Sequence, residues 1–485
     1  MYVKSLLRRS LWSLSLCFCL TAFAAAVVQA DDPVKLLEKA IYLEETVGKL
    51  DEAIKGYQTV IAASKESIDS AAQAQFRIAS CLAKQGKTQE SNAAFQAVVD
   101  NYSQATVWVN KAKEQLPGEP KLLPVPWGDG DELHMDITLP NGMAAGRQVF
   151  RVSKVAKDGR DYWQCDNWQM VTLNGMVSRS RVDVDFESFK PIRSTWTHTL
   201  LGQADATYDQ DKVTVEVAGK EKPVVLKLDK IMYDNEQCAE VLRRLPLEVG
   251  FQAEVTAVST LVAQKVPITV SVDKKETIET PAGKFECFKI DFSIGQSFWV
   301  SSDKHRYIVR FEAGGVAANL TKVRTVQLNE KTQLDSEFVS ATLPPLWHAY
   351  TPVKAKSGGT TVTHLIDSAA ALDTKLISGP IDKTKKKHAS PKAWLEYILE
   401  QQGKQGKHMK DFAVSDAGFK AITVDGHQGA VVQVEFTDGD KKMVGRSVAV
   451  FGKTSAVNLR FKAEKDVVEK WQPAIDEIIA SLKLK

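Results

Sequence analysis

The chain has 485 residues, of which 44% are hydrophobic and 25% charged, and its formal net charge is +3. This composition is typical of a globular protein and excludes a disordered or fibrous chain. The length exceeds what one hydrophobic core serves, so about two to four domains are expected. A net charge this close to zero argues against a nucleic-acid partner, which would need a concentrated basic surface.

The first thirty residues have the three zones of a secretory signal peptide. Lys4, Arg8 and Arg9 make a basic start, an apolar stretch follows up to Val28, and Ala30 stands at the cleavage spacing. We therefore expect residues 1–30 to be removed and the mature bacterial protein to be periplasmic or secreted. Removal takes three of the 63 basic residues and leaves their number equal to that of the 60 acidic ones. No later stretch has the about eighteen apolar residues of a membrane span.

Residues 31–116 carry a helical pattern that repeats. The stretch from Gly48 to Gln58 returns 38 positions later, from Gly86 to Gln96, and each copy contains a helix-ending glycine, a polar turn and a second helix. Glycine suits the left-handed position after a helix. One aromatic residue, Tyr57 or Phe95, holds the same place in both copies and is expected on the buried face.

This pattern resembles the tetratricopeptide repeat, whose usual period is about 34 residues. The extra length fits a longer loop between the copies, and a helix from Gln104 to about Leu116 is expected to cap the stack. The resemblance implies a concave groove that binds a peptide or a protein, with Tyr57 and Phe95 as its framework. Two other outcomes are open: so short a stack docks onto the rest of its own chain, or it pairs with a second copy of itself.

Strand-like alternation dominates residues 124–335, after a proline-rich linker that begins at Pro117. Between Val182 and Glu187, for example, apolar residues alternate with carboxylates. One short helix is expected, from Asn235 to Arg244, with acidic residues early and basic residues late, as the helix dipole prefers. The predicted fold is mainly antiparallel β, either a half-barrel or a sandwich.

Several segments, among them the turn from Thr280 to Phe285 and the run from Phe298 to Val309, resemble a family of exported bacterial β-domains of unknown function. That family is related to the half-barrels of lipoprotein carriers. Because those relatives hold acyl chains, the resemblance implies an apolar ligand here. Four aromatic side chains would line such a cavity: Trp163, Trp168, Trp196 and Trp299. Aromatic residues in a sheet are also ordinary core residues, which is the alternative for all four.

Residues 340–485 combine helix signals with a strand meander. Ser390 and Pro391 have the chemistry of a helix N-cap and first position, and Asp438-Gly439 favours a hairpin turn. The final helix has an apolar stripe that ends near Leu482 and contains Pro473, which would bend it or begin its second half.

The charged run at 382–388 is expected to be a solvated loop. The order of helix, antiparallel meander and closing helix, clearest over 429–482, resembles the PsbP-like α/β sandwich. The fold of that family mostly supports binding roles, and the likeness extends to fold alone. The whole chain is thus predicted to be an all-α helical repeat, then an antiparallel β-domain, then an α+β sandwich.

No catalytic or phosphate-binding signature occurs in the sequence. The histidines are scattered, and none stand at i, i+4 or in a short H-x-H, so neither a metal site nor a cofactor is expected. These histidines are His134, His198, His305, His348, His364, His388, His408 and His427. His198 beside Trp196 and His305 beside Asp303 are the two to consider for a site assembled from distant residues.

After loss of the signal peptide the cysteines are Cys81, Cys165, Cys238 and Cys287. Four cysteines in an exported chain could pair, but their spacing does not fit zinc. Cys81 and Cys287 lie in apolar patterns typical of buried, unpaired cysteine.

The predicted function is therefore that of an exported, non-catalytic envelope protein whose helical repeat binds another envelope protein. The first alternative is a carrier or sensor of a lipid or other apolar ligand that uses the β-domain. The second is a hydrolase whose site is assembled from distant residues.

Overall fold

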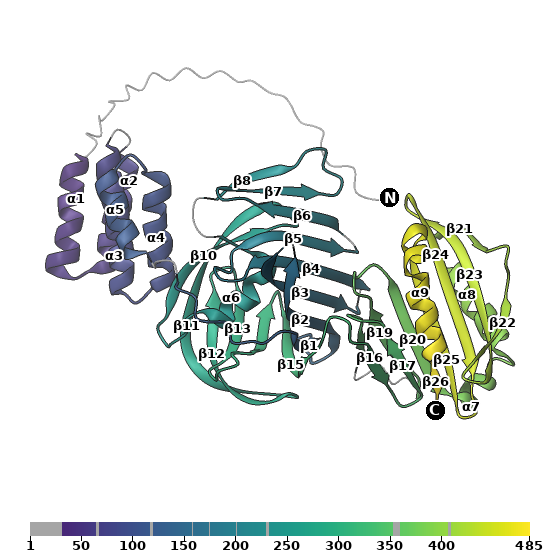
Figure 1. Ribbon diagram of the computed structural model, residues 1–485. Helices are drawn as coiled ribbons and strands as arrows, with labels where there is room; N and C mark the ends of the chain where they lie inside the picture. The colour runs from purple at the N-terminus through teal and green to yellow at the C-terminus, as the bar shows by residue number, and fades with distance from the viewer. Residues whose placement is uncertain are drawn as a thin grey trace, which may run out of the picture. The chain divides into compact units, whose positions relative to one another are not determined.

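The computed structural model describes residues 32–64, 67–116, 120–157, 159–173, 175–199, 201–228, 232–352, 359–405 and 409–485. The predicted signal peptide, His408 and the first residues of the predicted linker lie outside these ranges. The chain divides into two compact units, Met1–Leu116 and Pro117–Lys485. The first is all-α and the second mainly β with helices, which confirms the predicted fold class (Figure 1).

The first unit is a stack of antiparallel helices (Figure 1). Its elements are α1 (Pro33–Tyr42), the π-helical turn η1 (Leu43–Val47), α2 (Leu50–Ala63), α3 (Ile68–Lys84), α4 (Thr88–Asn101) and α5 (Thr106–Gln115). Gly48 and Gly86 follow their helices with φ of 73° and 72°, as the left-handed position requires. Because short turns join consecutive helices, α1, α3 and α5 run in the same direction.

The aromatic residues of the repeat form the core of this unit. Tyr57 and Phe95 are both buried, and the ring of Phe95 lies 5.2 Å from that of Phe76. Ala53 is fully buried and contributes only a methyl group, so neighbouring helices can approach closely. The repeat pattern in the sequence therefore predicted this packing correctly.

The second unit begins with one open sheet in the order β8-β7-β6-β5-β4-β3-β2-β1-β15-β14-β13-β12-β11-β10-β9, antiparallel except between β9 and β10. The first eight strands are β1 (Asp131–Thr138), β2 (Ala144–Lys157), β3 (Arg160–Val171), β4 (Met176–Asp185), β5 (Pro191–His198), β6 (Gly202–Tyr208), β7 (Lys212–Val217) and β8 (Val224–Lys227). The others are β9 (Met232–Asp234), β10 (Gln252–Ser259), β11 (Gln264–Thr280), β12 (Gly283–Phe292), β13 (Gln296–Ser301), β14 (Ile308–Ala313) and β15 (Val316–Thr325).

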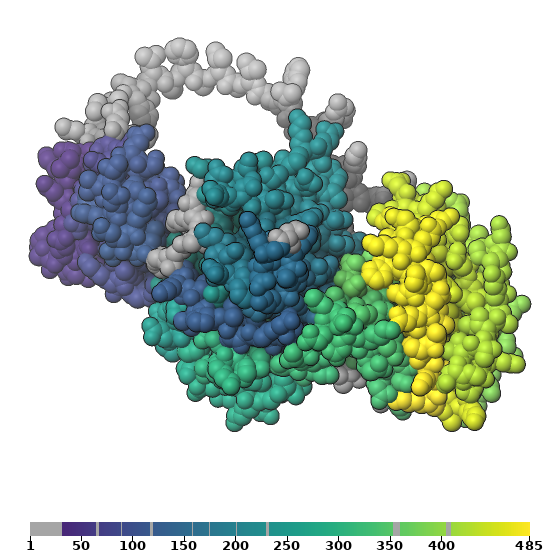
Figure 2. All heavy atoms as spheres, viewed as in Figure 1, coloured from purple at the N-terminus to yellow at the C-terminus, as the bar shows by residue number. Residues whose placement is uncertain are grey.

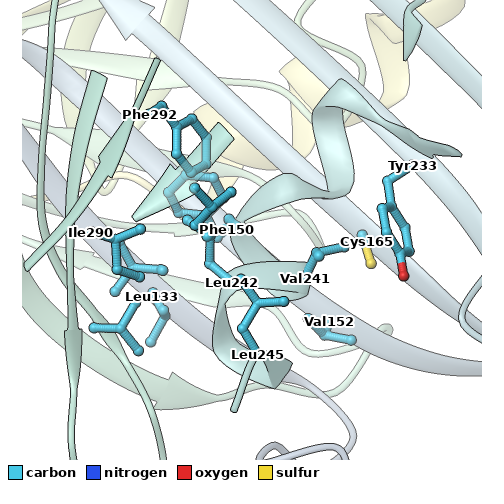
Figure 3. Close-up of a cluster of buried hydrophobic side chains, with 14 of the residues drawn as sticks. Leu133, Phe150, Val152, Cys165, Tyr233, Val241, Leu242, Leu245, Ile290 and Phe292 are labelled. Atoms are coloured by element: carbon cyan, nitrogen blue, oxygen red, sulfur yellow. The ribbon is translucent and has the colours of Figure 1, made fainter. Parts of the chain in front are cut away.

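A short helix fills the concave side of this sheet (Figure 1). The 3₁₀ turn η2 (Asn235–Gln237) leads into α6 (Cys238–Arg244), as the sequence predicted. Leu242 and Leu245 at the end of this segment pack among Leu133, Phe150 and Ile290 of the strands (Figure 3). The apolar interior of the half-barrel is thus the hydrophobic core of the domain.

The C-terminal part has a second, eight-stranded sheet with a helix on each face (Figure 1). Its strands are β18 (His348–Tyr350), β19 (Thr361–Ile366), β20 (Asp373–Pro380), β21 (Met409–Val414), β22 (Lys420–Val424), β23 (His427–Asp438), β24 (Lys441–Phe451) and β25 (Ser455–Glu464). The helices are α7 (Ile381–Lys385), α8 (Pro391–Gln405) and α9 (Lys465–Ser481). The apolar stripe of α9 packs on one face, and α9 forms the yellow ridge in Figure 2. α8 covers β23 and β24 on the other face.

Local signals in this domain were largely confirmed. The Ser390 hydroxyl accepts a hydrogen bond from the backbone N–H of Ala393 at the start of α8, and Gly439 makes the hairpin turn with φ of 64°. The prediction of a solvated loop for the charged run at 382–388 was wrong, because the first half of this run belongs to α7. Asp382 lies in the first turn of α7 and Lys385 in its last, where each charge suits the helix dipole.

A small third sheet joins β16 (Thr332–Asp335), β17 (Val339–Leu343) and β26 (Lys483–Leu484). Leu334 packs into the core of the C-terminal domain with Val339. β16 and β17 therefore pack with residues of the C-terminal domain.

The two large sheets are in direct contact within this unit. Val149, Trp168 and Met170 from the first sheet share a buried cluster with Tyr350 and Ile366 of the second. The indole N–H of Trp168 donates to the backbone carbonyl of Ser368 at 3.2 Å.

Candidate functional site

The helical repeat presents a row of exposed aliphatic side chains. Val34, Ile68 and Val107 stand within the first two residues of α1, α3 and α5, and their exposed fractions are 53%, 43% and 58%. Because these three helices run in the same direction and α3 contacts both of the others, the three side chains lie at the same end of the stack. Packed helix axes are about 8–10 Å apart, so the row extends across the stack. We call Val34, Ile68 and Val107 the aliphatic row.

The residues predicted as the repeat framework lie beneath this surface. The Tyr57 hydroxyl donates a 2.6 Å hydrogen bond to Glu44, which also pairs with Lys84 at 2.7 Å and Arg77 at 3.1 Å. Burial alone raises the pKa of Glu44, but the hydrogen bonds from Lys84, Tyr57 and Arg77 outweigh it and lower the pKa. Tyr57 and Phe95 therefore position the helices and leave contact with a partner to exposed residues.

The interior of the β-domain contains a small cavity beside α6. The cavity there, between α6 and β10–β11, measures about 10 Å³, which is roughly the volume one water molecule needs. Its wall is apolar and includes Val241, Leu242 and Phe292. Helix α6 occupies the concave side of the sheet, where an acyl chain would otherwise lie.

The four tryptophans proposed as a cavity lining lie in separate environments. Trp163 packs in the main core against Phe186, Trp168 lies at the contact between the two sheets, and Trp299 belongs to a third cluster. Trp196 is half-buried beside His198, with ring centroids 5.6 Å apart. At least three of these tryptophans are therefore ordinary core residues. The four do not line the wall of one cavity.

Sequence reasoning missed a buried polar cluster at the contact between the sheets. Glu132 and His134 alternate along β1, and His348 comes from β18; their ligand-type atoms lie within 4.8 Å of one another. His134 Nε2 is 2.6 Å from Glu132 Oε1, and the His134 and His348 rings are 5.8 Å apart. The Glu-x-His alternation was the visible half of this cluster, but the third member stands in another domain.

The electrostatics of this cluster favour a neutral imidazole at position 348. His348 is 3% exposed, neither of its ring nitrogens has a hydrogen-bond partner in the described structure, and burial lowers its pKa to about 3. Burial raises the pKa of Glu132, but the His134 hydrogen bond and nearby positive charges lower it overall to about 2. The cluster therefore holds one carboxylate and an uncharged His348 at neutral pH.

Two histidines and a glutamate are a ligand set that zinc uses. The guanidinium groups of Arg324 and Arg151 lie 3.8 and 4.0 Å from the Glu132 carboxylate. They already balance its charge, and a divalent cation placed here would meet both of them. The charge distribution therefore fits a metal poorly.

The two histidines singled out in the sequence lie outside this cluster. His198 Nδ1 accepts a hydrogen bond from the backbone N–H of Leu201, and burial lowers its pKa. The ring of His305 stacks on Tyr307 at 5.2 Å. Both histidines therefore have a structural role, His198 through a hydrogen bond and His305 through ring stacking.

All four cysteines of the described chain are free thiols. Cys81, Cys165 and Cys287 are buried, and Cys238 is half-buried. The prediction of buried, unpaired cysteine at positions 81 and 287 is confirmed.

Comparison with known families supports part of this layout. Residues 73–105 match a tetratricopeptide repeat model, and residues 135–316 match a protein family of unknown function, DUF3108. A search of curated proteins gave no match. The chain therefore contains a tetratricopeptide-like segment and a DUF3108-type β-domain. No helix in the described ranges is both long and apolar enough to span a membrane.

Solved structures resemble separate parts of the chain at low sequence identity. The cyanobacterial PsbP protein of Synechocystis is 13% identical and covers 33% of this chain and 95% of its own, with a TM-score of 0.27. A β-barrel-like DUF1849 protein of Brucella abortus is 13% identical, covers 43% and 100%, and has a TM-score of 0.30. LpqN of Mycobacterium tuberculosis, involved in cell envelope biogenesis, is 11% identical, covers 32% and 91%, and has a TM-score of 0.20.

Proposed function

We propose that this chain is an exported, non-catalytic envelope protein that binds another protein through its helical repeat. The observation that carries the proposal is the aliphatic row, formed by Val34, Ile68 and Val107 at one end of three parallel helices. Contiguous apolar patches on a protein surface mark contact sites, and repeat folds bind partners along extended surfaces. Export rests on the signal-peptide pattern of the first thirty residues.

The partner is expected to present an apolar stripe on an extended or helical segment. Glu44 is buried and paired within the repeat, whereas Asp32, Lys35 and Asp69 are exposed beside Val34 and Ile68. Recognition would combine burial of the apolar row with polar contacts to the charged residues at its rim.

A triple variant tests this function: Val34→Gln, Ile68→Gln and Val107→Gln. The matched control changes three aliphatic residues of the other unit with exposed fractions of 57–61%, Leu201→Gln, Val225→Gln and Val249→Gln. Both are expressed in the native cell and compared by quantitative co-purification. Loss of the same partner with the triple variant and with a chain lacking residues 31–116, but not with the control, supports the proposal. Unchanged partners in the triple variant overturn it.

The carrier alternative has weaker support from the geometry. The concave side of the β-domain is filled by α6, and the cavity of about 10 Å³ beside it is too small for an acyl chain. A carrier would require α6 to leave the sheet and expose Leu242 and Leu245, which are now buried. The Glu132–His134–His348 cluster consists of one carboxylate and two imidazoles, so it does not itself supply the nucleophile of a hydrolase.

A further inference from the structure

The C-terminal domain has a cavity of about 230 Å³ on the face of its sheet that α8 covers in part. Leu395 and Leu399 of α8 pack on Val432, Val434 and Phe436 of β23. The neighbouring strands β20 and β25 extend beyond this contact, and the cavity lies between their side chains and the edge of α8 at Gln402.

The strand register orders the side chains on the floor of the cavity from charged to apolar. One cross-strand row runs from Lys375 of β20 through Arg460 and Ser447 to Val432. Side chains directly opposite one another lie on the same face of a sheet. The floor therefore passes from cations, through a small hydroxyl side chain, to apolar groups within four strands.

The next row runs from the carboxylate of Asp373 through the cation of Lys462 and Gly445 to the apolar Val434. A Cβ atom on Gly445 would lie 2.9 Å from Val434 Cγ2, so the space above this strand depends on the absence of a side chain. The hollow is consequently fixed by two small residues, Gly445 and Ser447, in the middle of the sheet.

The polar end of the cavity carries an excess of positive charge. Lys375 Nζ lies 3.7 Å from Asp373 Oδ1, and these two charges offset one another. Arg460 uses its Nε to donate to Asn458 at 2.6 Å. The Asp373 carboxylate also acts on Arg460, but it is one anion among the three cations of the lining, Lys375, Arg460 and Lys462. Burial lowers the pKa of Arg460, which indicates that its cation is partly deprived of water.

The opposite end is aromatic and apolar. Met409, Phe412 and Phe436 line it, and the two phenylalanine rings lie 6.1 Å apart. A cavity with an apolar wall and a few convergent polar groups is the usual form of a small-molecule site. Its volume is below the about 300–1,000 Å³ of drug-sized sites, so its ligand is small.

We infer that this cavity binds a small amphipathic anion, a carboxylate with a single aliphatic chain. Arg460 and Lys462 hold the carboxylate by charge-assisted hydrogen bonds, for which the planar guanidinium is well suited. The aliphatic chain lies on Met409, Phe412 and Phe436. This site is separate from the aliphatic row, so the inference does not depend on the proposed protein partner.

Calorimetric titration of the full mature chain with decanoate, below its micelle concentration, tests the inference. Decanol is the uncharged probe of similar length. The variant Arg460→Gln with Lys462→Gln removes the two cations, and Lys442→Gln with Lys453→Gln removes two exposed lysines outside the cavity. Circular dichroism and melting curves establish that each variant is folded.

We expect saturable binding of decanoate, at least tenfold weaker binding by the Arg460/Lys462 variant, and unchanged binding by the Lys442/Lys453 variant. Decanol should bind more weakly than decanoate, and neither pair of substitutions should change its affinity appreciably. Absence of decanoate binding, or equal binding by the Arg460/Lys462 variant and wild type, would overturn the inference. A second variant, Ser447→Leu, fills the centre of the floor and should abolish binding without changing any charge.

Discussion

Trp168 and His348 place their rings 4.7 Å apart across the contact between the two large sheets. One comes from β3 and the other from β18, and both are almost completely buried. The contact is therefore part of the core of the second unit, and its residues can be tested through stability.

Replacing Trp168 with alanine is expected to lower the free energy of unfolding by about 3–5 kcal/mol, because a fully buried aromatic side chain leaves a cavity that the sheets cannot close. The change also removes the hydrogen bond to the Ser368 carbonyl. Urea denaturation of the full chain measures this loss. Trp196→Ala is the control, and since Trp196 is only half-buried its loss should be clearly smaller. Equal losses would contradict the structural role assigned to Trp168.

The neutral state of His348 predicts a pH dependence of stability. The folded-state pKa of His348 is about 3, below its ordinary value of 6.5. Between these values the unfolded chain binds the proton and the folded chain does not, so stability falls as the pH is lowered from 6.5 towards 3. For this one group the loss between pH 7 and pH 5 is about 2 kcal/mol.

The variant His348→Phe keeps a ring beside Trp168 and has no titrating group. Wild type should lose about 2 kcal/mol more than this variant between pH 7 and pH 5, measured by urea denaturation at each pH. Parallel pH profiles for the two proteins would show that His348 is not buried in its neutral form.

The burial of Glu240 on α6 predicts a pH dependence of stability with the opposite sign. It is 1% exposed, its Oε2 has no hydrogen-bond partner in the described structure, and burial raises its pKa to about 8. Above pH 4.5 the unfolded chain releases the proton that the folded chain retains, so this group reduces stability as the pH rises towards 8.

Glu240→Gln keeps the shape of the side chain and removes this titration. It is expected to stabilise the protein by about 1–3 kcal/mol at pH 7 and by much less at pH 5, because the cost of retaining the proton grows with pH. Unfolding by urea at both pH values measures the difference. A gain that does not change with pH would mean that Glu240 is already ionised in the folded protein.

Local structure was predictable because its causes are local. The helix-ending glycines at 48 and 86, the cap at Ser390 and the turn at Gly439 each act over a few residues, and each occurs where the sequence placed it. The short helix α6 was also visible from its charges, yet its position inside the half-barrel was not. That position depends on strands far away in the chain.

The sites were less predictable because they are assembled across sheets. Trp163 and Trp168 are five residues apart on β3, an odd spacing that points them to opposite faces, so they cannot line one wall. His348 joins Glu132 and His134 only through contact between two domains. The cavity in the C-terminal domain depends on the register of β20, β25, β24 and β23, which no single segment reveals.

The most direct test of the proposed function is photo-crosslinking in the native cell, with a photoreactive amino acid at position 68 or 107 of the aliphatic row and, as control, at position 201 or 249. All four side chains are exposed. One discrete protein adduct is expected from positions 68 and 107, and the control positions should not form it. Adducts that are absent at 68 and 107, or identical at all four positions, would contradict the claim that the helical repeat binds a protein partner.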